Sequence, residues 1–119
     1  GAELPKIYTT NWFRKDEAGK FVWPGYGENM RVLKWMLDRL EGKAQGEQTA
    51  FGVAPQYAEI NWTGLNFSAD QFKTVTNIDT QVWTEELASH TEHFDKLAYR
   101  LPQELLDIKA DLEKRLAAV

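Results

Sequence analysis

An apolar seam in the second half of the chain constrains the fold more than any other feature. Its members recur at spacings of four, three, four, three and four, the pattern of a helix that packs along one face. They are Trp83, Leu87, His90, Phe94, Leu97 and Leu101. Asp79 precedes the seam as a helix cap, and Pro102 stands where a new helix can begin. The predicted buried face of that next helix is Leu105, Ile108, Leu112 and Leu116. The second half is therefore predicted to be a helical pair.

Residues 7–23 predict a β-hairpin. The run 7–13 is β-branched and aromatic, which is typical of a strand. A polar turn follows, with Gly19 near its end, where a positive φ is usually required. Residues 21–23 then form a short returning strand. A small sheet is therefore expected beside the helices.

The middle of the chain predicts one longer helix and shorter elements. One proline and two glycines make 24–29 a constrained loop. The helix that follows has its apolar positions at Val32, Leu33, Met36, Leu37 and Leu40. Gly42 ends this helix, residues 42–48 are predicted to be a surface loop, and 51–55 an edge strand. A capping box that starts at Ser68 opens a brief helix.

These elements predict an α+β fold, in which a small hairpin-based sheet packs with about three main helices and the last two form a C-terminal helical pair. The chain has 119 residues, of which 43% are hydrophobic and 27% charged, a composition that suits one folded domain. We therefore expect a single domain over 1–119. Within it, 4–42 would be the hairpin, loop and helix, and 67–119 a helical tail.

Composition excludes several classes of function. The net charge is −4 and no dense Lys/Arg run is present, which argues against a nucleic-acid partner. No apolar run approaches the length of about 18 residues that spans a membrane. There are no cysteines, so thiolate metal sites and cysteine nucleophiles are excluded. We expect a monomeric, cytoplasmic protein without membrane partners.

The two histidines do not predict a metal site. His90 and His93 have a spacing that one helix could use for a metal, but a zinc site needs three or four ligands and no further ligand is singled out. His90 is better explained as a core or boundary residue, and His93 as a surface residue. No triad or phosphate-binding loop motif is found either. We therefore predict no catalytic residue and no metal ligand in this chain.

Three aromatic residues and one asparagine could hold a planar ligand. Phe13 and Phe21 flank the predicted turn and could stand side by side, while Tyr26 and Asn29 lie in and just after the constrained loop. Aromatic faces stack on a purine, and one amide offers a donor and an acceptor to read its edge. The alternative is that the rings form a hairpin core and Asn29 only caps the helix.

The first third of the chain resembles the GTP-dependent phosphoenolpyruvate carboxykinases. The segments that carry the resemblance are Leu4-Pro5-Lys6-Ile7, Asn11-Trp12-Phe13-Arg14-Lys15-Asp16, Gly19-Lys20-Phe21, Trp23-Pro24-Gly25-Tyr26-Gly27-Glu28-Asn29 and Arg31-Val32-Leu33-Lys34-Trp35. This signature is long and rare over residues 4–40. Past Gly42 the likeness is one of general layout, which ends in a similar helical tail.

The resemblance implies the last part of a longer enzyme, a lyase that decarboxylates oxaloacetate with GTP to give phosphoenolpyruvate, GDP and CO₂ in gluconeogenesis. Phe13 and Phe21 would be the rings that stack on guanine, Tyr26 the third ring of the pocket, and Asn29 the amide that reads the guanine edge. Gly27 and Glu28 fall in the same nucleotide-contacting loop. Two departures are Tyr26, where the family most often has phenylalanine, and Met30, where serine is usual.

The resemblance also implies what this chain lacks. GTP or GDP is the substrate nucleotide, and the Mn²⁺ and Mg²⁺ ions of the parent enzyme would have their ligands outside these residues, as would the phosphate-binding loop. Phosphoryl transfer depends on positioning and charge stabilisation by such groups, so the fragment alone is expected to be inactive. The other partner would be the rest of the parent enzyme. Alternatives are a stand-alone nucleotide-binding module, or a helical interaction module whose seam of residues 83–101 binds a partner.

Overall fold

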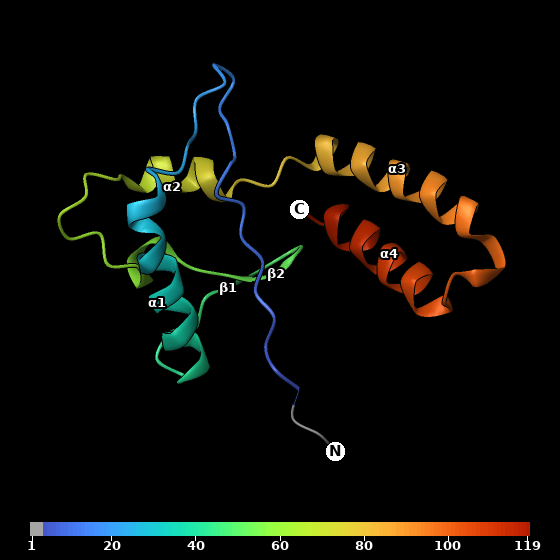
Figure 1. Cartoon of the computed structure of the whole chain (residues 1–119), viewed down its shortest axis with the longest axis horizontal. Coiled ribbons are helices and arrows are strands. Elements are labelled where there is room, and N and C mark those ends of the chain that lie inside the picture. The colour runs from blue at the N-terminus through green and yellow to red at the C-terminus, as the bar shows by residue number, and fades with distance from the viewer. Residues whose placement is uncertain (1–3) are drawn as a thin grey trace. The chain divides into compact units, whose positions relative to one another are not determined.

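The computed structural model describes residues 4–119. Within them the α-helices are α1 (Asn29–Leu40), α2 (Ala69–Thr76), α3 (Thr80–Leu97) and α4 (Gln103–Leu116), and the strands are β1 (Glu47–Thr49) and β2 (Gly52–Ala54), which pair in a two-stranded sheet (Figure 1). Short 3₁₀ turns occur at Tyr26–Glu28, Tyr57–Glu59 and Ala98–Arg100. The predicted α+β class with a C-terminal helical pair is confirmed. None of the helices within residues 4–119 combines the length and the hydrophobicity that a membrane span requires.

The chain forms two compact units. The first comprises the described residues up to Glu47 together with Val53–Asn77, and the second comprises Gln48–Gly52 and Ile78–Val119. The helix α2, which was predicted as part of the helical tail, belongs to the first unit because Phe72 packs into its core.

The core of the first unit is rich in aromatic rings. Trp35 on α1 is buried together with residues from three later segments. The buried members of this cluster are Trp35, Ala44, Ile60, Phe67 and Phe72, and half-buried rings around it include Tyr8, Tyr57 and Trp62. The ring of Trp62 stacks on that of Tyr57 at 5.4 Å between centroids and meets the ring of Phe67 at 5.0 Å. The irregular segment between β2 and α2 is therefore held by ring packing rather than by a sheet.

The predicted strands of 7–23 are wrong. In place of a ladder, the structure has one antiparallel bridge between Lys15 and Phe21, inside a loop that projects beyond α1 and α2 (Figure 1). A strand needs a neighbour to take its backbone hydrogen bonds, and Ile7 at the start of the run is exposed instead. The sheet lies at 47–54, where β2 falls within the predicted edge strand and β1 begins at the end of the predicted loop 42–48.

The helix boundaries that depend on local chemistry are confirmed. The hydroxyl of Ser68 accepts from the backbone N–H of Gln71, and the side chain of Gln71 accepts from the N–H of Ser68, which completes the capping box of α2. Asp79 caps α3. Gly42 follows α1 with a φ of +75°, a conformation that glycine adopts without steric cost. Local hydrogen bonding therefore sets where these helices begin and end.

The helical pair of the second unit packs mainly at one end. Leu87 of α3 and Leu116 of α4 are buried with Ala50, and Trp83 and Leu112 pack around them. At the other end of the pair the predicted seam residue Leu97 and the predicted α4 core residues Leu105 and Ile108 are exposed. The burial predicted for these three residues is therefore wrong, because two helices alone cannot cover both apolar stripes along their full length.

The connection between α3 and α4 also differs from the prediction. The seam predicted one helix through Leu101, but α3 ends at Leu97 and Ala98 has a positive φ of 46°. Leu101 is extended, with a ψ of 121°, because a residue before proline is disfavoured in the helical region. Pro102 thus ends the seam before α4 begins at Gln103.

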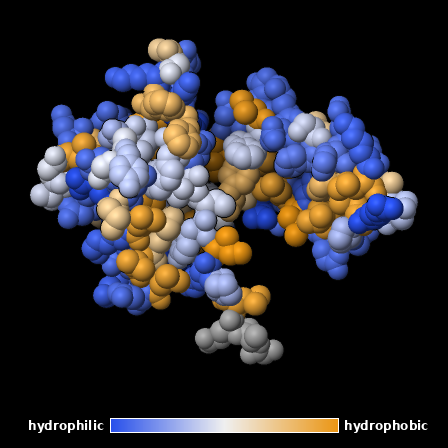
Figure 2. Space-filling view, viewed as in Figure 1, coloured by the Kyte–Doolittle hydropathy of each residue, from blue (hydrophilic) through white to orange (hydrophobic). Residues whose placement is uncertain are grey.

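The helix α1 has a second apolar face that its own unit leaves uncovered. Trp35 and Met36 pack in the core and Val32 is half-buried, whereas a stripe on another side of the helix is between 42% and 67% exposed. The stripe consists of Met30, Leu33, Leu37 and Leu40. Figure 2 shows apolar side chains gathered on the surface over α1. The burial predicted for Leu33, Leu37 and Leu40 is therefore wrong within this chain.

Gly46 is the glycine whose replacement should most disturb the first unit. Its φ is +65°, and an added Cβ would lie 2.5 Å from Val53 Cγ1 and 2.7 Å from the carbonyl oxygen of Ala54. We expect Gly46→Ala to lower the free energy of unfolding by about 2–4 kcal/mol, from backbone strain and overpacking together. The matched control is Gly64→Ala, because Gly64 has a φ of +80° and nothing within 4 Å of an added Cβ. Chemical denaturation measures the free energy of unfolding of both variants. Equal losses of this free energy in the two variants would contradict the steric argument.

Candidate functional site

A tight turn brings the two phenylalanines together. The carboxylate of Asp16 accepts from the backbone N–H of Lys20 at 2.9 Å, and Gly19 has a φ of +77°. The N–H of Val22 donates to the carbonyl of Arg14 at 3.0 Å. These bonds reverse the chain without a strand ladder. The turn predicted for residues 14–20, with its late glycine, is therefore confirmed.

The rings of Phe13 and Phe21 are neighbours on the surface. Their centroids lie 6.2 Å apart with an angle of 65° between the planes, an edge-to-face pair. Phe13 is 75% exposed and Phe21 52% exposed, so the two rings are not a buried hairpin core. Lys15 Nζ lies 5.2 Å from the centroid of the Phe21 ring. The predicted adjacency is confirmed, and the pair leaves aromatic surface open to a ligand.

Tyr26 stands apart from this pair. It opens the 3₁₀ turn Tyr26–Glu28, is 91% exposed, and in the described part of the chain its ring packs against no other aromatic ring. Gly25 has a φ of +128°, which excludes most other residues, and Gly27 has nothing within 4 Å of an added Cβ. The loop is therefore open on the side of these glycines. The structure does not bring Tyr26 into contact with the phenylalanines.

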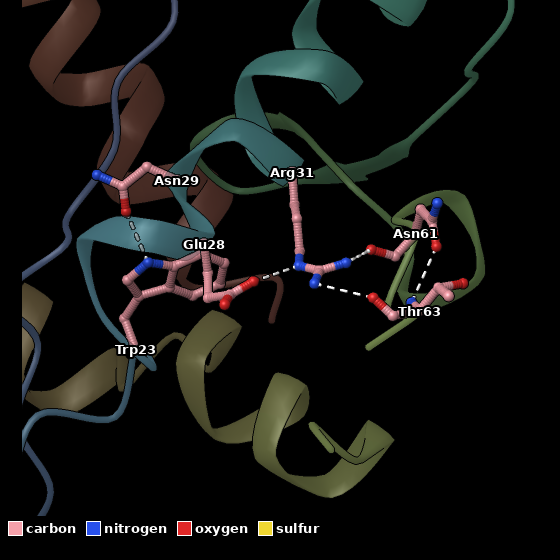
Figure 3. Close-up of polar contacts among 6 residues, drawn as sticks. All are labelled: Trp23, Glu28, Asn29, Arg31, Asn61 and Thr63. Atoms are coloured by element: carbon pink, nitrogen blue, oxygen red, sulfur yellow. Dashed lines mark hydrogen bonds and ion pairs between the residues drawn. The ribbon is translucent and has the colours of Figure 1, made fainter. Parts of the chain in front are cut away.

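Asn29 is the first residue of α1 rather than its cap. The cap position is Glu28, and no side chain forms a capping hydrogen bond there. The Asn29 amide oxygen instead accepts from the indole N–H of Trp23 at 2.8 Å (Figure 3). This contact was missed by sequence reasoning, because Trp23 counted only as part of a strand. The structure supports neither of the simpler alternatives: the phenylalanine rings do not form a buried hairpin core, and Asn29 does not cap the helix.

Glu28 is held by Arg31. The carboxylate of Glu28 pairs with Arg31 Nε at 2.5 Å, and the same guanidinium donates to the carbonyl oxygens of Asn61 and, at 3.0 Å, of Thr63 (Figure 3). Arg31 therefore ties the start of α1 to the segment 61–63, and the charge of Glu28 is neutralised within the chain. The i,i+3 spacing of Glu28 and Arg31 favours their ion pair, but nothing in the sequence pairs Arg31 with residues 61–63.

Glu59 has the most strongly altered acidity among the described residues. Its carboxylate accepts from the backbone N–H groups of Gln45, Gly46 and Gln56 at 2.8, 2.8 and 3.1 Å, and from the indole N–H of Trp35 at 2.9 Å. Partial burial alone would raise the pKa of this carboxyl, but the hydrogen bonds outweigh it and lower the pKa from 4.5 to about 2. Glu59 thus stays ionised and fastens the loop 45–46 to α1.

No metal centre is formed by the residues that the structure describes. Among them, no three His, Asp or Glu side chains are grouped to hold a metal ion. His90 lies near Glu86, with 3.5 Å between Nε2 and Oε1, and its ring stacks near Phe94. His90 is half-buried and His93 is exposed, as predicted. The residues that the structure describes therefore offer no fit for the Mn²⁺ and Mg²⁺ ions that the resemblance implies for the parent enzyme.

A groove in the second unit has no chemistry-bearing cluster. It has a volume of about 510 Å³ and lies between α3 and α4. Its lining is Thr80, Thr84, Leu87, Glu113, Leu116, Ala117 and Val119. One carboxylate and two hydroxyls among aliphatic groups do not make an acid–base pair or an anion site. The exposed rings of Phe13 and Phe21 remain the better candidate, as a surface element for a planar ligand.

Comparisons with known proteins match this chain to the C-terminal domain of a family of longer enzymes. The family model "Phosphoenolpyruvate carboxykinase C-terminal P-loop domain" matches residues 1–115. A phosphoenolpyruvate carboxykinase (GTP) of Anaeromyxobacter sp. (strain K) is 50% identical over 101 residues, which cover 85% of this chain and 17% of the relative. The Treponema pallidum (strain Nichols) enzyme of the same name is 44% identical over 114 residues, which cover 95% of this chain and 18% of the relative.

The resemblance is confirmed, and it extends past Gly42, where only a general likeness of layout was expected. The relative from Corynebacterium jeikeium (strain K411) is 35% identical over 118 residues, or 99% of this chain and 20% of the relative. The chain belongs to the GTP-dependent phosphoenolpyruvate carboxykinase family, as a part of its C-terminal domain. It spans about a fifth of the length of the curated relatives that it matches.

Proposed function

We propose that this chain supplies the guanine-binding pocket of a phosphoenolpyruvate carboxykinase, which converts oxaloacetate and GTP to phosphoenolpyruvate, GDP and CO₂. The observation that carries the proposal is the exposed pair of Phe13 and Phe21, at the positions where the family signature has its stacking rings. Aromatic rings that remain exposed to water after folding are suited to stacking on a base. Tyr26 and Asn29 would complete the pocket from the start of α1.

The proposal separates recognition from chemistry. In the residues described, no cluster of side chains could hold a metal ion, and the sequence has no GxxxxGK(S/T) phosphate loop. The decarboxylation, the phosphoryl transfer and the Mn²⁺ and Mg²⁺ ions are therefore assigned to other parts of a cytoplasmic, gluconeogenic enzyme. Gly27 would let the ligand approach the backbone closely. Glu28 would act indirectly, because its charge is already paired with Arg31.

The uncovered face of α1 favours a part of a larger enzyme over a stand-alone module. The stripe of Met30, Leu33, Leu37 and Leu40 is the kind of surface that the rest of a folded enzyme covers. A self-sufficient domain of this length would more commonly bury such a helix face. The chain is accordingly proposed to bind its nucleotide together with the remainder of the parent enzyme.

The test is a comparison of nucleotides. GDP and ADP are titrated into the isotope-labelled 119-residue chain and into the full-length enzyme, and amide shifts and dissociation constants are measured. We expect GDP to shift the resonances of 13, 21 and 26–29 and to bind at least tenfold more tightly than ADP. Millimolar affinity in the isolated chain would correspond to only about 4 kcal/mol, so the method must tolerate weak binding. Equal binding of GDP and ADP by the full-length enzyme would overturn the proposal.

A further inference from the structure

Trp23 is a buried residue whose single polar side-chain atom forms a hydrogen bond with Asn29. The Trp23 side chain is 6% exposed, and its ring is held by Trp12 at 5.5 Å, Phe67 at 6.0 Å and Trp62 at 6.5 Å between centroids. Its indole N–H donates to Asn29 Oδ1 at 2.8 Å. A ring fixed on several sides makes this donor rigid. The orientation of the Asn29 amide is therefore set by the core of the first unit.

The chemistry of indole decides which way the amide faces. An indole N–H can only donate, so the atom of Asn29 that meets it must be the oxygen. The amide nitrogen then points away from Trp23, as Figure 3 shows. Among the described residues no acceptor takes a hydrogen bond from this NH₂ group. Asn29 consequently presents two free donors and no free acceptor in that direction.

We propose that Trp23 is a positioning residue that makes Asn29 a donor-only reader of the base, and this inference depends on the proposed guanine pocket. One edge of guanine carries two acceptors, O6 and N7, whereas adenine carries an amino group in place of O6. The Asn29 NH₂ group, which points away from Trp23, can donate a hydrogen bond to guanine O6. It cannot form one with the adenine amino group, because both groups are donors. The Trp23–Asn29 bond therefore selects the 6-oxopurine class, to which hypoxanthine also belongs.

The main test is Trp23→Phe in the full-length enzyme, with dissociation constants for GDP, IDP and ADP. Phenylalanine keeps an aromatic ring in the cluster and removes the donor, so the Asn29 amide can turn over. We expect the preference for GDP over ADP to fall roughly tenfold, the size of effect that one hydrogen bond supplies. The preference for IDP over ADP should fall equally, because both 6-oxopurines carry the acceptor.

Trp12→Phe is the matched control. Trp12 belongs to the same ring cluster and donates no hydrogen bond from its indole in the described part of the chain, so its replacement should leave the preference unchanged. A second readout is hydrogen exchange of the indole protons in the labelled chain. Asn29→Ala should speed the exchange of the Trp23 proton and leave that of Trp12 unaltered.

The outcomes separate this inference from the function on which it depends. If Trp23→Phe weakens GDP and ADP binding equally, Trp23 only packs, and the inference is overturned while the pocket stands. If Asn29→Ala also leaves the preference intact, Asn29 does not read the base and the proposed pocket loses its amide. Should Trp23→Phe fail to fold, Asn29→Asp decides: it keeps the acceptor for the indole and turns an oxygen outward. Retention of the GDP preference in that variant would overturn donor-only reading.

Discussion

Replacing Phe13 and Phe21 together by alanine should weaken GDP binding to the full-length enzyme by roughly 100-fold. Stacking between a base and an aromatic ring contributes about 1–3 kcal/mol per contact, and each 1.4 kcal/mol is about a factor of ten in affinity. The two rings are exposed, so their removal should change the free energy of unfolding by only about 0.5 kcal/mol. Titration calorimetry with GDP and a thermal melt of the same sample measure both quantities.

Tyr99→Ala is the matched control for this double variant. Tyr99 is 88% exposed and belongs to the second unit, so it tests whether any exposed ring would have the same effect. Tyr99→Ala should leave the affinity for GDP unchanged. A double variant that binds GDP within threefold of the native protein would show that the phenylalanine pair is not the stacking site.

Replacing Glu59 by alanine should destabilise the first unit by about 2–4 kcal/mol, because the side chain accepts hydrogen bonds from several segments. Its carboxylate accepts four hydrogen bonds, from three backbone N–H groups and from the indole of Trp35. Alanine leaves those donors without their charged partner, and each such loss is costly where the donor is shielded from water. Glu47→Ala is the control, since Glu47 is exposed on β1. Equal losses in the two variants would refute this role for Glu59.

The same carboxylate should make stability depend on pH in acid. The pKa of Glu59 is lowered from 4.5 to about 2 in the folded chain, so the unfolded chain takes up the proton more readily than the folded chain. The stabilisation is complete above about pH 4.5 and is lost as the pH falls towards about 2. Denaturation midpoints measured across this range should fall more steeply for the native chain than for Glu59→Gln. Parallel pH profiles would contradict this assignment.

What could be predicted from sequence is the part that local chemistry determines. The Ser68 box, the Asp79 cap and Gly42 after α1 each depend on residues within a few positions of one another. The strand pattern of 7–13 failed because a strand needs a partner, and which segment pairs with which is not a local property. Phe13 and Phe21 still became neighbours, because the turn at Asp16 and Gly19 is itself local.

The parts of the site that escaped prediction involve contacts across long sequence separations or a choice of orientation. Arg31 reaches the carbonyl of Asn61, and Glu59 reaches both Gly46 and Trp35. Nothing in the spacing of these residues identifies them as partners. Trp23 and Asn29 are close in sequence, but the consequence of their hydrogen bond depends on which end of the amide faces the indole. That orientation is set only in the folded chain, where the core holds the Trp23 ring in place.

The exposure of Phe13, Phe21 and Tyr26 has a calorimetric consequence. Folding leaves these apolar faces hydrated, so the heat capacity of the unliganded chain still includes their ordered water. A planar ligand that covers them releases this water, and the association then has a negative heat-capacity change. Its enthalpy therefore becomes more favourable on warming, even though the rings contribute almost nothing to holding the chain together.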